Sequence, residues 1–245
     1  MRAVLLAGHK DSGKTGLAES LCRRFREMGH RVAVAKFSHH AMDRANSDTQ
    51  RLTQAAHGTI AFDPETTSLI LPGQRSLQDF LPLVSAQVLI VEGGKHLGCL
   101  PRIILPRKGD SRQELDQELA LAQWSDTPVS GLTQLTDSAQ AAQLVLERGF
   151  LLPDLNCGGC GREDCSQLAR EIVAGEADVS QCTALSPQGI EIAVNGEPIP
   201  LNPFVRNLVQ NTLKGILSSL KGGSSGQVEI RLDMADQPAS SGPSG

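Results

Sequence analysis

The sequence is poor in aromatic side chains: none of its 245 residues is tyrosine, one is tryptophan, and aromatic residues make up 3% of the chain. It also lacks an excess of basic charge, because 23 Lys and Arg stand against 27 Asp and Glu, a formal net charge of −4. Proteins that bind nucleic acid present a basic surface, and those that bind single strands also use aromatic rings for base stacking. We therefore expect no nucleic-acid partner.

Long apolar runs are missing as well. A transmembrane helix needs about 20 consecutive apolar residues, and no run in the sequence approaches that length. The apolar opening, 1–8, is shorter than the core of a secretion signal and leads directly into a glycine-rich pattern. We expect a cytoplasmic protein that does not insert into a membrane.

Cysteines are few and unevenly placed. Four of the six fall between residues 157 and 182, in a segment, 151–200, that holds 2 basic and 8 acidic residues. All six histidines precede residue 100. In a reducing cytosol, clustered thiols usually bind metal rather than form disulfides. The composition thus divides the chain into two regions with different chemistry.

The first 150 residues alternate between short apolar runs and amphipathic segments. The runs predict buried parallel strands at 4–7, 31–37, 88–91 and 102–105. Apolar spacings of three and four, with capping residues, predict helices at 17–28, 48–57 and 137–148. This alternation favours an α/β fold with a doubly wound, P-loop NTPase-like sheet over residues 1–150.

The amino-acid composition changes near residue 153. Cysteine, glycine and acidic residues dominate 153–184, a segment that we interpret as a small metal-binding module with one short helix. A small α+β unit of ββαβ order is predicted over 188–233, with a hairpin at Asn195-Gly196 and a last strand at 227–232. Ser, Gly and Pro fill 235–245, which we expect to be disordered.

A complete phosphate-binding pattern follows the first predicted strand. Glycines let backbone N–H groups surround an anion, and the helix that follows adds its positive dipole end. Lys14 would pair with the β- and γ-phosphates, and the Thr15 hydroxyl would bind Mg²⁺. An ordinary glycine-rich turn is the alternative. The residues that match G-x-x-x-x-G-K-[ST] are Gly8, His9, Lys10, Asp11, Ser12, Gly13, Lys14 and Thr15.

Two carboxylates are candidates for the same site. Glu92 stands at the end of the predicted strand 88–91, where a nucleotide-binding protein places an acid that binds Mg²⁺ or orients water; a turn cap is the alternative. Asp48 follows a polar loop with His39 and His40, which could be a switch near the γ-phosphate, a transition-metal site or a solvated loop. The guanine-reading N-K-x-D signature is absent, so the sequence does not identify the base.

Four blocks, in order, resemble the molybdopterin-guanine dinucleotide biosynthesis protein B (MobB) family over about residues 1–150. The resemblance implies an adapter that binds GTP, hydrolyses it weakly, forms homodimers and assists the guanylyltransferase that joins GMP to molybdopterin. The sequence departs from the family at Gly93-Gly94, where an aromatic residue often follows the first glycine, and in its long C-terminal extension. The blocks are the phosphate loop, Lys36-Phe37-Ser38-His39-His40-(x)2-Asp43 with Asp48-Thr49-(x)-Arg51, Leu89-Ile90-Val91-Glu92-Gly93-Gly94-Lys95, and Pro101-Arg102-Ile103-Ile104-Leu105.

The cysteine spacing is the second strong pattern. Three thiols within nine residues, and a fourth after one short helix, favour an iron–sulfur cluster, whereas structural zinc prefers two short hooks. Zinc and metal-free thiols remain alternatives. The segment resembles the four-cysteine [4Fe–4S] domain of Rnf-type electron-transport B subunits and corrinoid iron–sulfur proteins, which implies a [4Fe–4S] cluster. The ligands would be Cys157, Cys160, Cys165 and Cys182.

Together these patterns indicate a GTP-binding adapter in molybdenum cofactor synthesis that also carries an iron–sulfur cluster. Its expected partners are the guanylyltransferase or molybdopterin and a molybdenum or tungsten enzyme as client. Two alternatives stay open: a nucleotide-gated carrier of electrons or clusters, and a small-molecule kinase on the same phosphate loop. A kinase would need a second, acceptor-binding site, which the sequence does not reveal.

Overall fold

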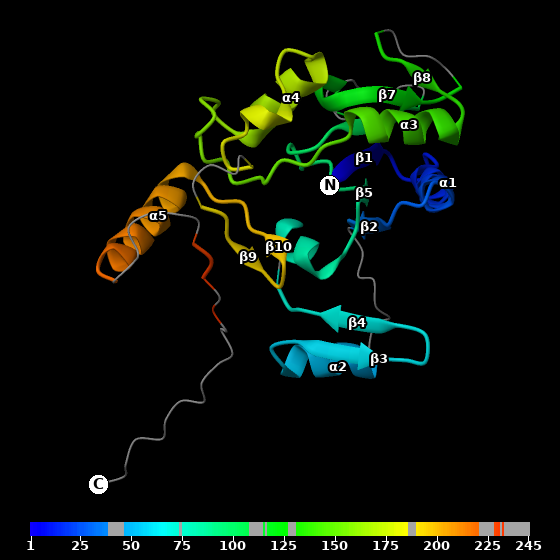
Figure 1. The fold of residues 1–245 in the computed structure, drawn as a ribbon. Coiled ribbons are helices and arrows are strands. Elements are labelled where there is room, and N and C mark those ends of the chain that lie inside the picture. Colours follow the sequence, from blue (N-terminus) through cyan, green and yellow to red (C-terminus); the bar gives the residue numbers. More distant parts are fainter. Residues whose placement is uncertain are drawn as a thin grey trace.

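The structure is a computed structural model that describes residues 1–38, 47–73, 75–107, 115, 117–126, 131–185, 190–220, 228–230 and 232. Its centre is a sheet of six parallel strands, which confirms the predicted α/β class (Figure 1). From one edge to the other the strands are β2 (Val32–Lys36), β5 (Val88–Glu92), β1 (Arg2–Gly8), β6 (Arg102–Leu105), β7 (Ala120–Trp124) and β8 (Gln134–Leu135).

Helices cover both faces of this sheet because its central strands are apolar on both sides. Successive side chains of β1 point to opposite faces. Leu6 packs with α1 (Lys14–Glu27) and α3 (Ser138–Arg148) in one core cluster. Its neighbour Leu5 belongs to a second cluster that includes α4 (Cys165–Ala174). The cysteine-rich segment therefore builds one layer of the fold and shares its core.

A helix and a hairpin form a separate group beside the sheet (Figure 1). The predicted helix near residue 48 is α2 (Asp48–Ala55), and its cap is confirmed, since the Ser47 hydroxyl accepts a hydrogen bond from the Gln50 N–H at 3.1 Å. The strands β3 (Thr59–Phe62) and β4 (Thr67–Ile70) pair with each other, antiparallel, in a two-stranded sheet of their own.

The C-terminal unit is only partly the predicted ββαβ arrangement. The hairpin is β9 (Ala193–Val194) with β10 (Glu197–Pro198), and the helix is α5 (Pro203–Ser218). The strand expected at 227–232 was wrong for the residues that can be judged there, since 228–230 and 232 form no strand. Alternating apolar residues favour a strand only when another strand offers its free edge. The tail 235–245 lies outside the described residues.

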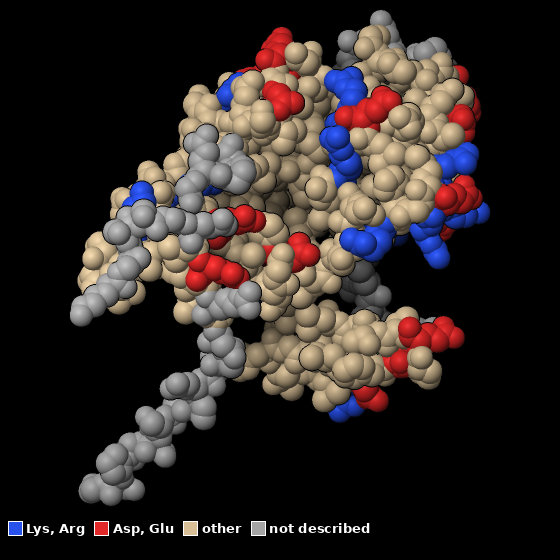
Figure 2. All heavy atoms as spheres, viewed as in Figure 1, with Lys and Arg blue, Asp and Glu red and all other residues tan. Residues whose placement is uncertain are grey.

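The helix α5 is exposed along much of its apolar face. Phe204 is 74% exposed, and Leu208 and Ile216 are also exposed, as is Leu220 just after the helix. Figure 2 shows this helix as a largely uncharged surface, whereas acidic and basic side chains are mixed over the sheet domain. In the part of the chain that the structure describes, no helix is long and apolar enough to cross a membrane.

Two strands at one edge of the sheet, β7 and β8, were not predicted. The strand β7 carries Gln123, which is fully buried and donates a side-chain hydrogen bond to the Leu132 carbonyl at 3.1 Å. A polar residue of this kind breaks the continuous apolar run by which buried strands are recognised. The 3₁₀ helices among the described residues are η1 (Gln78–Leu83), η2 (Gln117–Leu119) and η3 (Val179–Gln181).

Arg102 is buried in the core, and a substitution there tests this packing. Its guanidinium donates to the carbonyls of Lys95 and Leu97, each at 2.8 Å. We expect Arg102→Met to lower the free energy of unfolding by about 2–4 kcal/mol, because a buried carbonyl left without a donor costs roughly 1–3 kcal/mol. Urea unfolding measures this change.

An exposed arginine serves as the matched control for the buried Arg102. Arg31 also donates to a carbonyl, that of Ser85 at 3.0 Å, but it is exposed. Water can replace that hydrogen bond, so Arg31→Met should cost less than about 1 kcal/mol. Equal losses in the two variants would contradict a special contribution from Arg102.

Candidate functional site

The phosphate loop has the backbone geometry that anion binding needs. Gly13 is left-handed, with φ of 89°, and directly precedes α1, whose first turn receives no side-chain cap. The free N–H groups of that turn and the positive end of the helix dipole therefore face the loop. At Gly8 a side chain would collide with the Ser12 hydroxyl and come within 3.0 Å of the Leu105 carbonyl, so this position requires glycine.

Lys14 lies folded over this loop. Its Nζ donates to the His9 carbonyl at 2.5 Å and lies 3.5 Å from the Ser12 hydroxyl. Burial lowers the pKa of the Lys14 ammonium, and the nearby Glu92 carboxylate acts in the opposite direction. A partly desolvated cation held over a ring of N–H groups is suited to a phosphate.

Two strand ends and the first turn of α1 meet beside the loop. Glu92 is the last residue of β5 and is 8% exposed. The Thr15 hydroxyl, in the first turn of α1, donates to Glu92 Oε1 at 2.8 Å. Lys36 ends β2 opposite Glu92 in the parallel register, and its Nζ lies 3.5 Å from the same oxygen. The sequence assigned Thr15 and Glu92 the same role, binding of Mg²⁺, and the structure brings them into contact. The contact of Lys36 was not predicted, although Lys36 and Glu92 end neighbouring strands.

Asp48 is not brought to this group. It is the first residue of α2, its side chain is 94% exposed, and its carboxylate pairs with Arg51 at 3.5 Å. The rest of the expected switch loop, with His39, His40 and Asp43, lies outside the described residues. A role for Asp48 in a switch stays a prediction.

The glycine pair after β5 has a structural reason. Both glycines are left-handed, with φ of 82° at Gly93 and 68° at Gly94. A side chain on Gly93 would come within 2.7 Å of the Phe37 carbonyl, and one on Gly94 within 2.9 Å of the Phe37 ring. The ring of Phe37 also meets His96 edge to face, with centroids 5.6 Å apart. In the family an aromatic residue often follows the first glycine. Here that position is Gly94, and the ring of Phe37 lies against it.

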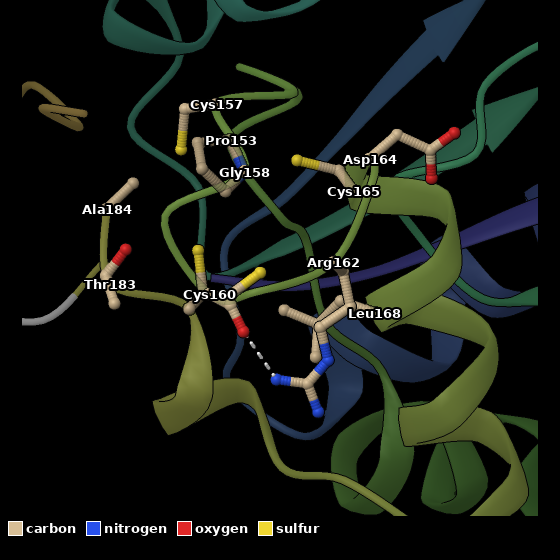
Figure 3. A pocket seen from close by; sticks show the side chains of 11 residues that line it. Pro153, Cys157, Gly158, Cys160, Arg162, Asp164, Cys165, Leu168, Thr183 and Ala184 are labelled. Atoms are coloured by element: carbon tan, nitrogen blue, oxygen red, sulfur yellow. Dashed lines mark hydrogen bonds between the residues drawn. The ribbon is translucent and has the colours of Figure 1, made fainter. Parts of the chain in front are cut away.

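The four clustered cysteines line one small pocket beneath α4 (Figure 3). Figure 3 shows Cys157 and Cys160 on the glycine-rich loop and Cys165 at the start of α4. Cys182 follows η3 and closes the set. Cys157 is exposed, whereas Cys165 and Cys182 are buried. The structure therefore brings together the thiols that the spacing had grouped.

Backbone and side-chain contacts fix the segments that carry these thiols. The Asn156 side chain accepts from the Cys165 N–H at 2.9 Å, and Asp164 caps α4 by accepting from the Gln167 N–H at 2.7 Å. Asn156 is left-handed, with φ of 46°, as asparagine tolerates. Burial raises the pKa of the Cys165 thiol and of the Asp154 carboxyl nearby.

Arg162 connects the loop of Cys160, the helix α4 and the segment before Cys182. It was not singled out from the sequence. Its Nη1 donates to the Cys160 carbonyl at 2.9 Å, as the dashed line in Figure 3 shows. Its Nε and Nη2 donate to Glu171 of α4 at 2.9 and 2.6 Å, and Nη2 also donates to Gln181 at 2.7 Å, next to Cys182. The pair raises the pKa of Arg162 and lowers that of Glu171, so both stay charged.

Two family models match the chain. The one described as "Molybdopterin guanine dinucleotide synthesis protein B" matches residues 3–126, just over half of the sequence, and the one described as "Putative Fe-S cluster" matches 152–184. The chain belongs to the MobB family. The resemblance predicted from the sequence is confirmed for both segments, and the second segment contains all four cysteines of the pocket.

Similar proteins extend over different shares of the chain. The "Putative molybdopterin-guanine dinucleotide biosynthesis adapter protein" of Methanocaldococcus jannaschii is 26% identical over 96% of this chain and 99% of its own. The crystal structure of Bacillus subtilis MobB covers 61% of this chain and 99% of its own, at 19% identity and a TM-score of 0.50. Another solved molybdopterin-guanine biosynthesis protein B covers 59% and 97%, at 22% identity and a TM-score of 0.45. The Bacillus subtilis structure supports the fold, and the archaeal relative also spans the extension.

In this MobB family member the two sites share one core. The Leu152 N–H donates to the Cys99 carbonyl at 2.8 Å, which joins the entry to the cysteine segment with the loop after β5. On that loop a side chain at Gly98 would lie 2.6 Å from the side chain of Ser166, the residue after Cys165. The chain from Glu92 to Gly98 therefore runs directly from the phosphate loop to the cysteine pocket.

The C-terminal helix of this MobB family member also touches the cysteine segment. Arg206 of α5 is buried and donates to the carbonyls of Thr183 and Ala184, at 2.6 and 3.1 Å, just after Cys182. A side chain at Gly159 would lie 2.6 Å from Pro203, at the start of α5. Close packing of α5 explains why the loop has glycine there.

Cys99 lies outside the cysteine pocket, and its thiol should be less reactive than that of Cys157. It is fully buried, and burial raises the pKa of its thiol to about 12. Since the thiolate is the nucleophile, metal-free native protein should leave Cys99 unlabelled by iodoacetamide at pH 8 and pH 9, while the exposed Cys157 reacts. Mass mapping measures the labelling, and unfolding in urea should expose both. Native labelling of Cys99 as fast as that of Cys157 would contradict the buried assignment.

Proposed function

We propose that this protein binds GTP with Mg²⁺ and acts as an adapter in molybdopterin guanine dinucleotide synthesis, and that it carries a [4Fe–4S] cluster. The observation that carries the nucleotide half is the contact of Thr15 with Glu92, at 2.8 Å, beneath a complete phosphate loop. A hydroxyl and a carboxylate are hard oxygen ligands of the kind that Mg²⁺ prefers. Lys14 would hold the β- and γ-phosphates above them, and Glu92 would bind the ion or orient water for weak hydrolysis.

The donor set supports the cluster half. Four thiols line one pocket, and glycines at 158 and 161 keep the backbone close to it with positive φ. Three of these thiols lie within nine residues and the fourth follows one short helix, a spacing that suits a four-iron cluster, whereas structural zinc prefers two short hooks. The arrangement therefore favours the cluster, held by Cys157, Cys160, Cys165 and Cys182.

The adapter role follows from the family and from the archaeal relative, whose name describes it as an adapter and which matches nearly the whole chain. We propose the guanylyltransferase or molybdopterin as partner, a molybdenum or tungsten enzyme as client, and a cytoplasmic homodimer as the working form. Nucleotide binding at Thr15 and Glu92 would act on the cysteine pocket through the segment 93–98, which follows Glu92 and meets Ser166, the residue after Cys165, at Gly98.

One observation favours a second candidate, a nucleotide-gated electron carrier. Cys157 is exposed, so a cluster bound there would lie near the surface, where a redox partner can approach. In that case the client would exchange electrons with the cluster, and nucleotide would control docking. Reduction of the cluster by the client, without guanylyl transfer, would favour this candidate.

One sample tests both halves. Protein purified without oxygen is analysed for iron, sulfide and zinc and is titrated with Mg–GTP and Mg–ATP. We expect about four iron and four sulfide per chain, as a [4Fe–4S] cluster requires, and saturable binding of GTP. Colourless protein with one zinc per chain would reject the cluster half, and failure to bind either nucleotide would reject the nucleotide half.

The coupling is measured on the same material. Affinity for Mg–GTP and for the guanylyltransferase is compared between oxidised, reduced and cluster-free protein. We expect the cluster-free form to differ, because Ser166, next to Cys165 at the start of α4, packs against Gly98 of the loop that follows Glu92. Identical affinities in all three forms would reject the link between the sites.

A further inference from the structure

One buried hydroxyl of the cysteine segment has no partner in the fold. The Oγ1 of Thr183, the residue after Cys182, is buried and makes no hydrogen bond with any residue that the structure describes. Buried polar groups in native proteins are almost always hydrogen-bonded, because an unpaired one costs free energy. This hydroxyl therefore points to an acceptor that binds to the folded chain.

The hydroxyl lies beside the clustered thiols. Thr183 lines the cysteine pocket and stands across it from α4 (Figure 3). A side chain on Gly159 would come within 2.6 Å of the Thr183 Oγ1, so this oxygen lies against the backbone between Cys157 and Cys160. Since Cys182 directly precedes Thr183, the hydroxyl is next to the segments that carry three of the four thiols.

The backbone at Thr183 is held on both sides. Arg206 Nη1 donates to the Thr183 carbonyl at 2.6 Å, and the Leu185 N–H donates to the Cys182 carbonyl at 3.1 Å. Threonine is branched at Cβ, so its side chain has few rotamers. A fixed backbone and a restricted side chain keep the hydroxyl in the buried space beside the thiols.

We infer that the Thr183 hydroxyl donates a hydrogen bond to a sulfur atom of the cluster and raises its reduction potential. This inference rests on the proposed [4Fe–4S] cluster. Hydrogen bonds to the sulfurs are one of the factors that set the potential of such clusters. Reduction adds one electron and breaks no bond, so the sulfurs carry more negative charge in the reduced state. A hydrogen bond to them is then stronger and stabilises that state.

The first test removes the donor and keeps the branched shape. In Thr183→Val we expect the reduction equilibrium to shift about tenfold toward the oxidised cluster, a potential lower by about 59 mV for one electron. Thr183→Ser keeps the hydroxyl and should restore most of the shift. Potentials are read by electron paramagnetic resonance during an anaerobic redox titration of the full chain, after iron and sulfide analysis has shown equal loading.

A second readout separates a hydrogen bond from packing. Electron–nuclear double resonance of the reduced cluster in H₂O and in D₂O detects the exchangeable protons near it. Thr183→Val should lose one proton coupling that Thr183→Ser retains. In cluster-free protein, Thr183→Val should resist urea at least as well as the unchanged protein, because it removes a buried hydroxyl without a partner.

Thr212→Val is the matched control. It also removes a threonine hydroxyl, but this one is on the exposed side of α5 and already donates to the Leu208 carbonyl at 2.8 Å. The potential and the proton couplings should stay unchanged in this variant. Should Thr183→Val hold no cluster, Thr183→Ala replaces it, since it removes the hydroxyl without adding a methyl group in its place.

The outcomes divide as follows. A lower potential and a lost coupling in Thr183→Val, both restored in Thr183→Ser, support the inference. It is also supported if the valine and alanine variants hold no cluster while the serine variant does. An unchanged potential or coupling in loaded Thr183→Val, or loss of the cluster from all three variants, overturns it and leaves the proposed cluster intact. Wild-type protein without iron and sulfide rejects the cluster half of the proposed function itself.

Discussion

Replacing Lys14 with alanine is expected to weaken Mg–GTP binding by at least about 100-fold. Lys14 is the cation over the phosphate loop, and burial of its ammonium lowers its pKa. A hydrogen bond to a charged group contributes roughly 1.5–3 kcal/mol. The bond between the Lys14 ammonium and a phosphate is stronger, because both groups are charged. Calorimetric titration with Mg–GTP measures the loss.

Two further variants separate phosphate binding from metal binding. Thr15→Val and Glu92→Gln change the oxygen pair that would hold Mg²⁺, so both should lose affinity mainly when Mg²⁺ is present. Without Mg²⁺, Glu92→Gln should bind the nucleotide no worse than the unchanged protein, because a carboxylate near the phosphates has been neutralised.

The control for Lys14 is another lysine of the same site. The Lys36 Nζ lies 3.5 Å from Glu92 Oε1, but the side chain is 53% exposed and its partner is a carboxylate of the protein. We expect Lys36→Ala to cost at most about tenfold in GTP affinity, in line with the small energies of exposed ion pairs. If Lys14→Ala and Lys36→Ala had the same small effect, the phosphate loop would not be a triphosphate site.

The parts of the fold that could be predicted are those governed by local pattern. The strand at 4–7 and the helix after Gly13 follow from a buried apolar run and a regular apolar stripe, and both are present. Capping residues were equally informative: Asp137 caps α3 and Asn202 caps α5, each by accepting a backbone N–H. Short-range hydrogen bonds of this kind depend on neighbours in sequence.

The parts that could not be predicted depend on distant partners. The strand β7 was missed because Gln123 is buried only by virtue of its contact with Leu132 in the next segment. The predicted strand at 227–232 failed for the opposite reason, since a suitable pattern found no strand to pair with among the described residues. Residue patterns report local preference, and sheet edges are decided by tertiary contacts.

The residues of the candidate sites show the same distinction between local pattern and distant contacts. The phosphate loop and the four cysteines are contiguous motifs, so spacing was sufficient to group them. Lys36, Arg162 and Arg206 act across the fold, and only the strand register or the helix packing brings them to the sites.

If the proposed cluster is bound, breaking the Arg162–Glu171 pair is expected to shift its reduction potential in opposite directions in the two single variants. Arg162 lines the cysteine pocket and its guanidinium lies 2.6 Å from Glu171. Arg162→Gln removes a positive charge and should lower the potential, whereas Glu171→Gln leaves that charge unbalanced and should raise it. Potentials are read by electron paramagnetic resonance during an anaerobic redox titration.

The same pair should also determine how firmly the cluster is held. Arg162→Gln breaks the contacts to Cys160, Glu171 and Gln181, so we expect iron to be lost to a chelator roughly 10–100-fold more readily, the usual cost of losing a contact that orients metal ligands. Arg162→Lys keeps the charge without the planar fork, so it should lose iron more readily while its potential stays close to that of the unchanged protein. Potentials that move in the same direction in Arg162→Gln and Glu171→Gln would show that distortion of the pocket, and not charge, governs the cluster.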